Sequence, residues 1–325
     1  MNFSDRILQS AGALTALQEK SPLVHCITSP IAVNDCANAV LAAGARPIMA
    51  EHPEEVEEIT SISASLGVSL ANITDARRES IFLSGRAAKE RGIPSVIDAV
   101  GVTCSRMRLD LARRFLTECR PAVIKGNASE IRALSGASFG VCGIDTAEQD
   151  RVSEGIPDSE RAMAEIVRDF AAQSGAVVLA SGASDLVSNG TETFALRNGS
   201  AHMGRITGTG CILNCLVAAY LAAASPLDAC LAAVTLLNLS GEYAERETVR
   251  EAEAMRKMEA GALVTGKAPD GRGTAGEAGA GRGAAPAAPI RRLPLGTFHI
   301  KLLDGLSLLT EADLIQGIRG EKICL

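Results

Sequence analysis

Apolar and polar positions along this chain form short apolar runs that alternate with longer stretches of helical periodicity. Runs of four to six mostly apolar residues predict strands at 23–27, 47–50, 68–73, 95–98, 122–125 and 176–180. Apolar residues at helical spacing predict helices over 1–20, 33–44, 54–66, 77–91, 109–119, 161–173, 212–221 and 227–244. Two further short runs flank Asn189-Gly190, which predicts a hairpin. The alternation predicts an α/β fold with a largely parallel central sheet and helices on both faces.

Polar residues occur where several of these strands end. Asp98, Lys125 and Ser181 each lie at or just beyond the end of a predicted strand, as does the segment 72–75. Ligands of parallel α/β sheets bind outside the carboxyl ends of the strands. We therefore expect these side chains to share one ligand-binding edge.

A glycine turn before the helix at 212–221 is the most specific local signal. Gly208 and Gly210 flank Thr209, and Cys211 follows directly. Such a turn leaves the N–H groups of a helix N-terminus open to an anion, which would suit a phosphoryl group in transfer. A thiol at that position should have a lowered pKa and could accept a proton. Taken alone, the motif is more typical of a glycine-rich cap on a buried helix.

The residues at the strand ends fit phosphoryl transfer, although each has a plainer explanation. Lys125 could pair with a phosphate, or it could be a solvated strand end. Asp98 and Glu130 offer the oxygen ligands that Mg²⁺ prefers. Asn127 and Glu130 also have the spacing of a capping box. Ser181 could contact a nucleotide, and Met49 could line an apolar pocket or belong to the core.

Composition narrows the class of protein. The chain has 325 residues, a formal net charge of −6 and nine cysteines without a CxxC pair. No basic stripe points to nucleic acid, and no signal peptide or membrane-length apolar segment is present. We expect a cytoplasmic protein with no nucleic acid or membrane partner. We also expect one domain over 1–325, with a flexible Gly-, Ala- and Pro-rich insertion at about 266–289.

Five stretches together resemble the hydroxyethylthiazole kinase family of the ribokinase-like superfamily. They are LVHCITSPIAVNDCANAVLAAGARPIMA, VIDAVG, AVIKGNASEI, ITGTGCILNCLVAAYLA and, more weakly, LGTFHIKLLDGLS. The resemblance spans about residues 10–245 and resumes near 295–318. It implies ATP- and Mg²⁺-dependent phosphorylation of the hydroxyl of 4-methyl-5-(2-hydroxyethyl)thiazole in thiamine salvage.

The resemblance also implies roles for individual residues and an assembly. Met49 and Gly208 would contact the thiazole, while Lys125 and Ser181 would contact ATP. The Mg²⁺–phosphate end would be held by Asp98, Asn127 and Glu130. Gly208, Gly210 and Cys211 would form the catalytic anion hole, with Cys211 at the position of an aspartate base in many relatives. Family members form homotrimers with active sites between adjacent subunits.

Three short segments differ from the family pattern on the substrate side. Ser29-Pro30 replaces Asn-Asn, Ala99 replaces a proline after Asp98, and Thr74 replaces a glycine after Asn72-Ile73. These differences leave two alternatives open. The chain could be a ribokinase-like kinase for another small alcohol, such as hydroxymethylpyrimidine, or a thiazole- or nucleotide-binding protein without turnover.

Overall fold

The computed structural model describes residues 1–136, 157–265 and 293–325. Within these residues, nine strands form one sheet in the order β2-β1-β3-β4-β5-β6-β7-β8-β9. The strands from β1 to β6 pair in parallel, and β7, β8 and β9 are added in antiparallel pairs. Their bounds are β1 (Leu23–Ile27), β2 (Arg46–Ile48), β3 (Ser65–Ser69), β4 (Ser95–Asp98), β5 (Val123–Asn127), β6 (Val177–Ser181), β7 (Asp185–Ser188), β8 (Thr193–Leu196) and β9 (Gly320–Ile323).

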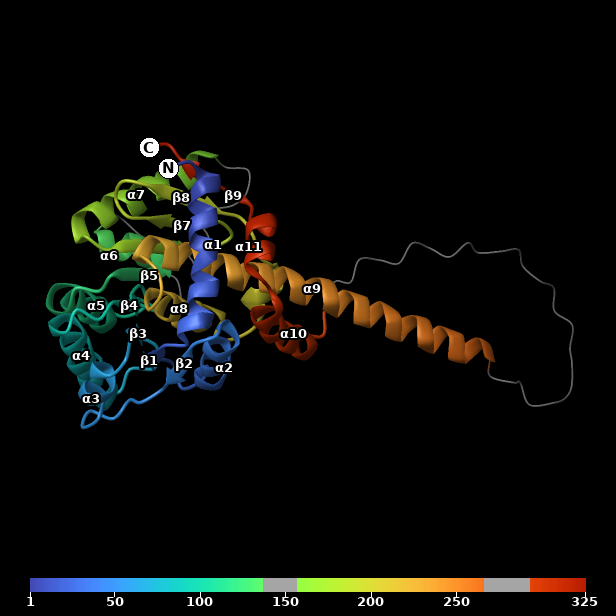
Figure 1. The fold of residues 1–325 in the computed structure, drawn as a ribbon, viewed down its shortest axis with the longest axis horizontal. Helices are drawn as coiled ribbons and strands as arrows, with labels where there is room; N and C mark the ends of the chain where they lie inside the picture. The colour runs from blue at the N-terminus through green and yellow to red at the C-terminus, as the bar shows by residue number, and fades with distance from the viewer. Residues whose placement is uncertain (137–156, 266–292) are drawn as a thin grey trace, which may run out of the picture.

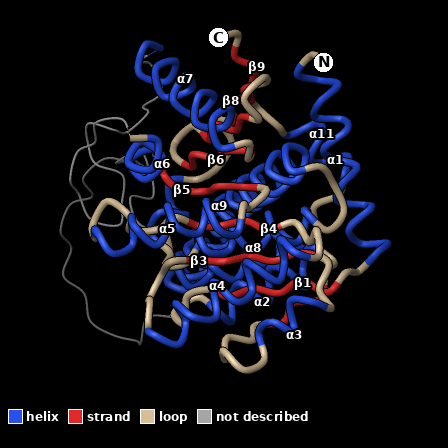
Figure 2. The backbone as a smooth tube through the Cα atoms, turned by 90° about the vertical axis from the view of Figure 1, so that its left-hand side faces the viewer, coloured by secondary structure: helices blue, strands red, loops and turns tan. Residues whose placement is uncertain are grey.

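Helices cover both faces of this sheet (Figure 2). One face carries α1 (Phe3–Lys20), α2 (Val33–Ala43), α8 (Thr209–Leu221), α9 (Pro226–Thr265), α10 (Leu295–Leu308) and α11 (Glu311–Gly317). The other carries α3 (Val56–Ser61), α4 (Asp75–Glu90), α5 (Arg106–Cys119), α6 (Ala128–Ser135) and α7 (Pro157–Ser174). The prediction of a largely parallel sheet between two helical layers is therefore confirmed.

Successive residues of the central strands belong to opposite cores. Val96 and Val123 pack in the core on the α8 side, and Ile97 and Ile124 pack in the core on the α4–α5 side. Because side chains alternate along a strand, the next residue of each strand points back toward α8. The sheet thus directs Asp98 of β4 and Lys125 of β5 toward one helix, although β5 does not end at Lys125 as predicted but continues to Asn127.

The predicted strand at 68–73 is shifted in the structure. The observed strand, β3, begins at Ser65, and the helix predicted over 54–66 is confined to α3. The first residues of this strand are polar or small, so they do not form an apolar run. Ser65 is nevertheless buried, and it donates from Oγ to the Ala218 carbonyl of α8. A Cβ at Gly67 would lie only 3.0 Å from Ala218 Cβ, so the small residue allows α8 to pack closely on β3.

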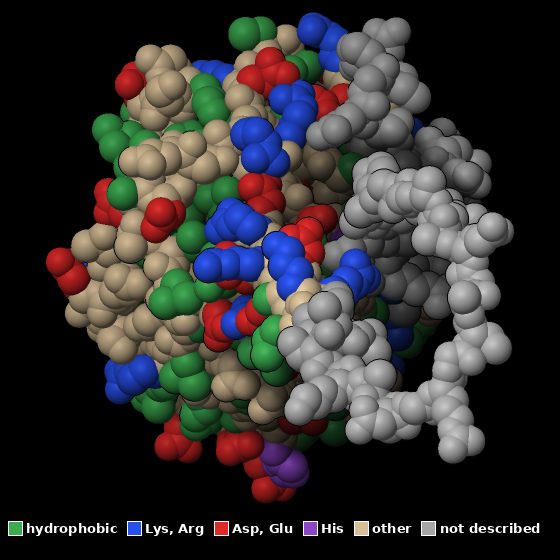
Figure 3. Space-filling view, turned by 90° about the vertical axis from the view of Figure 1, so that its right-hand side faces the viewer, with side chains coloured by type: hydrophobic (Ala, Val, Ile, Leu, Met, Phe, Trp, Pro, Cys, Tyr) green, Lys and Arg blue, Asp and Glu red, His purple; other side chains and the backbone are tan. Residues whose placement is uncertain are grey.

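The C-terminal half also departs from the sequence pattern. The apolar helix at 227–244 and the charged stretch after it form one helix, α9, which projects from the body (Figure 1). Figure 3 views the molecule from the side toward which α9 projects, where Lys, Arg, Asp and Glu side chains gather. On its projecting part Met255 and Met258 are exposed, and Glu251 pairs with Lys301 of α10 at 3.0 Å. The strand β9 was not predicted at all.

Two expectations concern residues outside those that the structure describes. The insertion predicted at 266–289 is one, and most of the polar segment between α6 and α7 is the other. In the part of the chain that is described, no helix is both long and apolar enough to cross a membrane.

Candidate active site

The N-terminus of α8 is open, as the glycine turn predicts. Gly208 caps the helix with φ of +95°, and a Cβ there would lie 2.7 Å from Ala32 Cβ. No side chain caps the helix, and its first bond runs from the Ile212 N–H to the Gly208 carbonyl at 2.8 Å. The N–H groups of Thr209, Gly210 and Cys211 therefore have no partner within the helix. Together with the helix dipole, they can bind an anion.

A buried ion pair lies beside this helix end. Asp98, the last residue of β4, and Lys125, in the middle of β5, are register partners, and Lys125 Nζ lies 3.0 Å from Asp98 Oδ2. A Cβ at Gly210 would be 3.4 Å from the same Nζ, which places the ammonium against the first turn of α8. The structure thus brings together Asp98, Lys125 and Gly210, three residues selected from separate segments of the sequence.

Burial and charge act in opposite directions on this pair. Burial lowers the pKa of Lys125, but the charge and hydrogen bond of Asp98, together with further negative charge nearby that includes Glu130, outweigh it, so the pKa is raised and the ammonium stays charged. Burial raises the pKa of Asp98, and Lys125 opposes that rise. Asp98 Oδ1 is buried without a hydrogen-bond partner. Such an atom is costly unless a ligand or cation meets it.

Glu130 and Asn127 form the capping box that their spacing permits. The Asn127 side chain accepts from the Glu130 N–H at 2.9 Å, and Glu130 Oε2 accepts from the Asn127 N–H at 2.8 Å. Glu130 Oε1 accepts from the Gly101 N–H at 2.7 Å. Burial, and then repulsion from Asp98, raises the pKa of Glu130 to about 7 against these bonds. Glu130 is therefore held rigidly, close to the charge of Asp98.

The carboxylates of Asp98 and Glu130 suit a cation that also takes oxygen ligands from a bound phosphate. Among the described residues, no three His, Cys, Asp or Glu side chains are grouped as a metal site. Asp98 offers its unpartnered Oδ1, and Glu130 keeps spare lone pairs on both of its oxygens. Mg²⁺ is commonly bound by one or two carboxylates plus phosphate oxygens. The donor set suits that arrangement.

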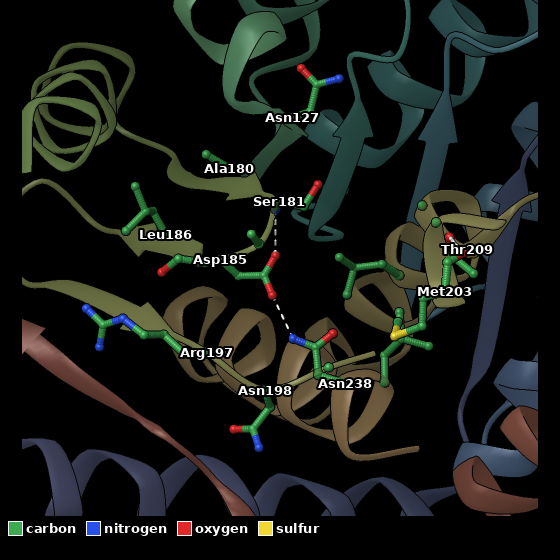
Figure 4. Close-up of a pocket in the computed structure, with 18 of the residues that line it drawn as sticks. Asn127, Ala180, Ser181, Asp185, Leu186, Arg197, Asn198, Met203, Thr209 and Asn238 are labelled. Atoms are coloured by element: carbon green, nitrogen blue, oxygen red, sulfur yellow. Dashed lines mark hydrogen bonds between the residues drawn. The ribbon is translucent and has the colours of Figure 1, made fainter. Parts of the chain in front are cut away.

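A cavity of about 880 Å³ extends from this helix end along the sheet (Figure 4). Thr209 and Gly210 line one end, Ser181 and Gly182 line a side, and Leu186 and Arg197 lie on the side away from Thr209 (Figure 4). Ser181 is the register partner of Asn127 across β5 and β6. Its Oγ donates weakly to the Gly126 carbonyl at 3.4 Å. The cavity can hold an elongated ligand with one end at α8.

Met49 lies apart from these residues. It follows β2, and β1 and β3 separate β2 from β4, so roughly 14 Å of sheet lies between. His25 holds the segment in place, donating from Nε2 to the Ala50 carbonyl at 2.9 Å and accepting from Thr60 at 2.8 Å. Burial lowers the pKa of His25, which fits this neutral form.

The segment after β1 connects the two regions. Ala32 touches Gly208, and Ser29 donates from Oγ to Asn72 Oδ1 at 2.7 Å. Arg77 of α4 is buried and donates both to the Thr28 carbonyl and to Glu51, which follows Met49 by two residues. Ser29, one of the departures from the family pattern, thus fixes the loop that borders the helix end.

The expected low pKa of Cys211 is wrong. Burial, followed by the nearby Asp98 carboxylate, raises the pKa of the thiol to about 11, and Lys125 opposes this only in part. The helix N-terminus and the ammonium do not offset the desolvation of a thiolate beside a buried carboxylate. Cys211 is therefore a neutral thiol near pH 7, which is a poor proton acceptor.

We expect Cys211→Ala to lower turnover by less than about tenfold, because a protonated thiol contributes little as a base. The pH dependence of kcat between pH 6 and 9 should match that of the unaltered protein. The measurement is a coupled rate assay over that range, with Cys211→Ser as a second variant. A loss of about a hundredfold or more in both variants would restore Cys211 as the base.

Three side chains that the sequence reasoning missed border the site. They are Asp185 and Asn238, which bond to each other at the cavity, and Arg77 behind the loop after β1. A signal for Asp185 existed, since it lies four residues after Ser181 at the start of the predicted hairpin. Asn238 and Arg77 lie within helical patterns, where a polar residue is normally solvated.

A parallel α/β sheet in which an open helix end and a buried lysine lie beside a cavity is typical of ATP-dependent small-molecule kinases. The sequence model of the hydroxyethylthiazole kinase family matches residues 14–258 of this chain. The chain therefore belongs to the hydroxyethylthiazole kinase family.

Individual relatives agree with this assignment. The chain is 48% identical over 230 residues to hydroxyethylthiazole kinase 2 of Clostridium botulinum (strain Hall), covering 71% of this chain and 86% of that protein. It is 37% identical over 242 residues to hydroxyethylthiazole kinase 1 of Methanosphaera stadtmanae, covering 73% and 84%. The structure of the hydroxyethylthiazole kinase protein from Pyrococcus horikoshii OT3 matches with a TM-score of 0.73 at 28% identity, over 97% and 99% of the chains.

A more distant structure shows the shared fold alone. Pyridoxal kinase from Staphylococcus aureus in complex with ADP matches with a TM-score of 0.51 at 15% identity, over 68% of this chain and 88% of that one.

Proposed function

We propose that this chain transfers the γ-phosphoryl group of ATP to the hydroxyl of 4-methyl-5-(2-hydroxyethyl)thiazole, a step of thiamine salvage. Family membership supports the reaction. The single structural observation that carries it is the convergence of Lys125 with the open N–H groups of α8 at one end of the cavity. Phosphoryl transfer depends chiefly on such positioned positive charge.

In this proposal each residue of the helix end has a defined task. The N–H groups of Gly210 and Cys211, together with Lys125 Nζ, receive the negative charge that builds on the transferring group. Asp98 holds the ammonium in place, and Ser181 contacts ATP from the side of the cavity. The neutral Cys211 thiol packs beside the reacting groups without taking a proton.

The charges at this end of the sheet support Mg²⁺ as a companion of ATP. Asp98 and Glu130 carry two potential negative charges against the single charge of Lys125. Asp98 and Glu130 would hold the ion together with ATP phosphates, while Asn127 keeps Glu130 oriented through the capping box. When bound, Mg²⁺ supplies charge neutralisation for the phosphates.

The acceptor alcohol is proposed to lie between Gly208 and the segment that carries Met49. The loop after β1 borders Gly208, and its Ile31 side chain is exposed, with a relative exposure of 68%. Leu41 of α2 and Ile300 of α10 are also exposed apolar side chains, on two helices joined by the His299–Asp35 contact at 3.1 Å. We propose that other copies cover this surface in a homotrimer and complete the acceptor site.

A coupled assay of ADP release with this thiazole alcohol, with and without Mg²⁺, tests the function. We expect turnover only when the alcohol, ATP and Mg²⁺ are all present. Equal or faster turnover of a hydroxymethylpyrimidine would instead favour that alcohol as the substrate. This alternative is motivated by Ser29, which differs from the family pattern and contacts Asn72. Binding of the thiazole by calorimetry without any ADP release would favour the non-catalytic alternative.

A further inference from the structure

Asp185 is a buried acidic side chain that has no part in the proposed chemistry. It is the first residue of β7 and is 5% exposed. Its Oδ1 accepts from the Gly182 N–H at 3.0 Å, and its Oδ2 accepts from the Asn238 side-chain amide at 2.6 Å (Figure 4). A buried carboxylate is costly unless its oxygens meet donors. Here each oxygen meets one.

These two bonds join opposite walls of the cavity. Gly182 belongs to the turn from Ser181 to Asp185 that connects β6 with β7, and both Ser181 and Gly182 line the cavity. Asn238 lines it from α9. Gly182 is exposed, whereas Asp185 behind it is buried. Asp185 thus fixes an exposed turn to a helix that crosses the same face of the sheet.

The chemistry of the partners requires acceptors at this position. Both partners present N–H groups, and an ionised carboxylate offers only acceptors. Burial raises the pKa of Asp185 to about 6, while the bonds from Asn238 and Gly182 and the charge of Lys125 oppose the rise. The side chain is therefore mainly ionised at neutral pH. The two donors help to maintain that state, so removing the carboxylate would release both of them.

We propose that Asp185 is a positioning residue for the nucleotide. Through its bonds to Gly182 and Asn238, it fixes the Ser181–Gly182 turn in the conformation that contacts ATP. The inference rests on the proposed function, because it takes the ligand of this cavity to be ATP. Asp185 also lines the cavity, but its two oxygens are bonded to Gly182 and Asn238, so it acts through these partners and not on the reacting atoms.

Asp185→Ala tests this role by removing both acceptors. We expect KM for ATP and the calorimetric Kd for ADP to rise about tenfold, since tenfold corresponds to about 1.4 kcal/mol, close to the contribution of one hydrogen bond to a charged group. KM for the thiazole alcohol should change less than twofold. In the conservative variant Asp185→Asn, the amide can accept from Gly182 and donate to a turned Asn238 side chain, so the Kd for ADP should return to within about threefold of the original.

Asp228→Ala is the matched control. Asp228 is likewise buried and hydrogen-bonded, to Arg6 and Ser225, but it lies about 15 Å along α9 from Asn238. The Asp228→Ala variant should lose thermal stability without any change in its Kd for ADP. An unchanged Kd for ADP in folded Asp185→Ala would overturn the inference, as would an equal rise in Asp228→Ala or no recovery in Asp185→Asn. Failure of the unaltered protein to bind ADP would instead reject the proposed function.

Discussion

Lys125→Met should lower kcat by about a hundredfold or more, because it removes a buried cation that lies against the first turn of α8. Methionine has nearly the length of lysine and fills the same space. The Kd for ADP should rise by a smaller factor, because the negative charge that builds on the transferring group is greatest in the transition state. Coupled rate assays and calorimetry with ADP measure the two effects separately.

The same substitution leaves Asp98 buried without a counter-charge, so it should also destabilise the fold by about 3–5 kcal/mol. The double variant Lys125→Met, Asp98→Asn separates stability from catalysis. It should recover most of the lost unfolding free energy in urea titrations while remaining as inactive as the single variant. Turnover within tenfold of the original in either folded variant would contradict the proposed role of Lys125.

The grouping of polar side chains at one edge of the sheet could be predicted because it follows from the connectivity of parallel strands. Asp98, Lys125 and Ser181 were chosen only as polar residues at the ends of apolar runs. The structure places all three on the α8 side of the sheet. Side chains alternate between the two faces along a strand, and each of the three lies an even number of residues along its own strand from a side chain in the core on the α8 side. The open helix end was predictable for a similar reason, because the glycine turn acts on the residues next to it.

Other features depend on partners that are distant in the sequence. The raised pKa of Cys211 results from burial beside Asp98, which no local motif encodes. The bond between Asp185 and Asn238 spans 53 residues. The strand β9 pairs with β8, and its four residues, of which three are partly buried, include two charged ones and no apolar run to indicate a strand. Sequence patterns identify elements and their ends, whereas these features arise from the packing of whole elements.

The separation of Met49 from Lys125 has the same origin. The strand order β2-β1-β3-β4-β5 places three strands between them, although only two predicted strands separate the segments of Met49 and Lys125 along the chain. A pocket that includes both ends must extend across the sheet or be completed by another copy. The homotrimer proposed above satisfies this requirement through the exposed apolar side chains of α2 and α10.

Gly210→Ala should lower kcat by about tenfold to a hundredfold without destabilising the protein. Gly210 lies in the first turn of α8, outside the left-handed backbone region, and its added Cβ would sit 3.4 Å from Lys125 Nζ without a clash. Alanine is favoured over glycine in helices by about 0.5–1 kcal/mol, so the melting temperature should stay equal or rise. The methyl group would nevertheless occupy the space in which a phosphate oxygen approaches the N–H groups.

Gly296→Ala is the matched control, because Gly296 lies in the first turn of α10 and a Cβ there meets nothing within 4 Å. It should gain similar stability and keep its turnover. Gly208 is unsuitable for this comparison, since its φ of +95° and its contact with Ala32 would strain any side chain. A Gly210→Ala variant that is stable and fully active would show that the transferring group does not meet α8. Equal losses in both variants would point to a general effect on the fold instead of the anion site.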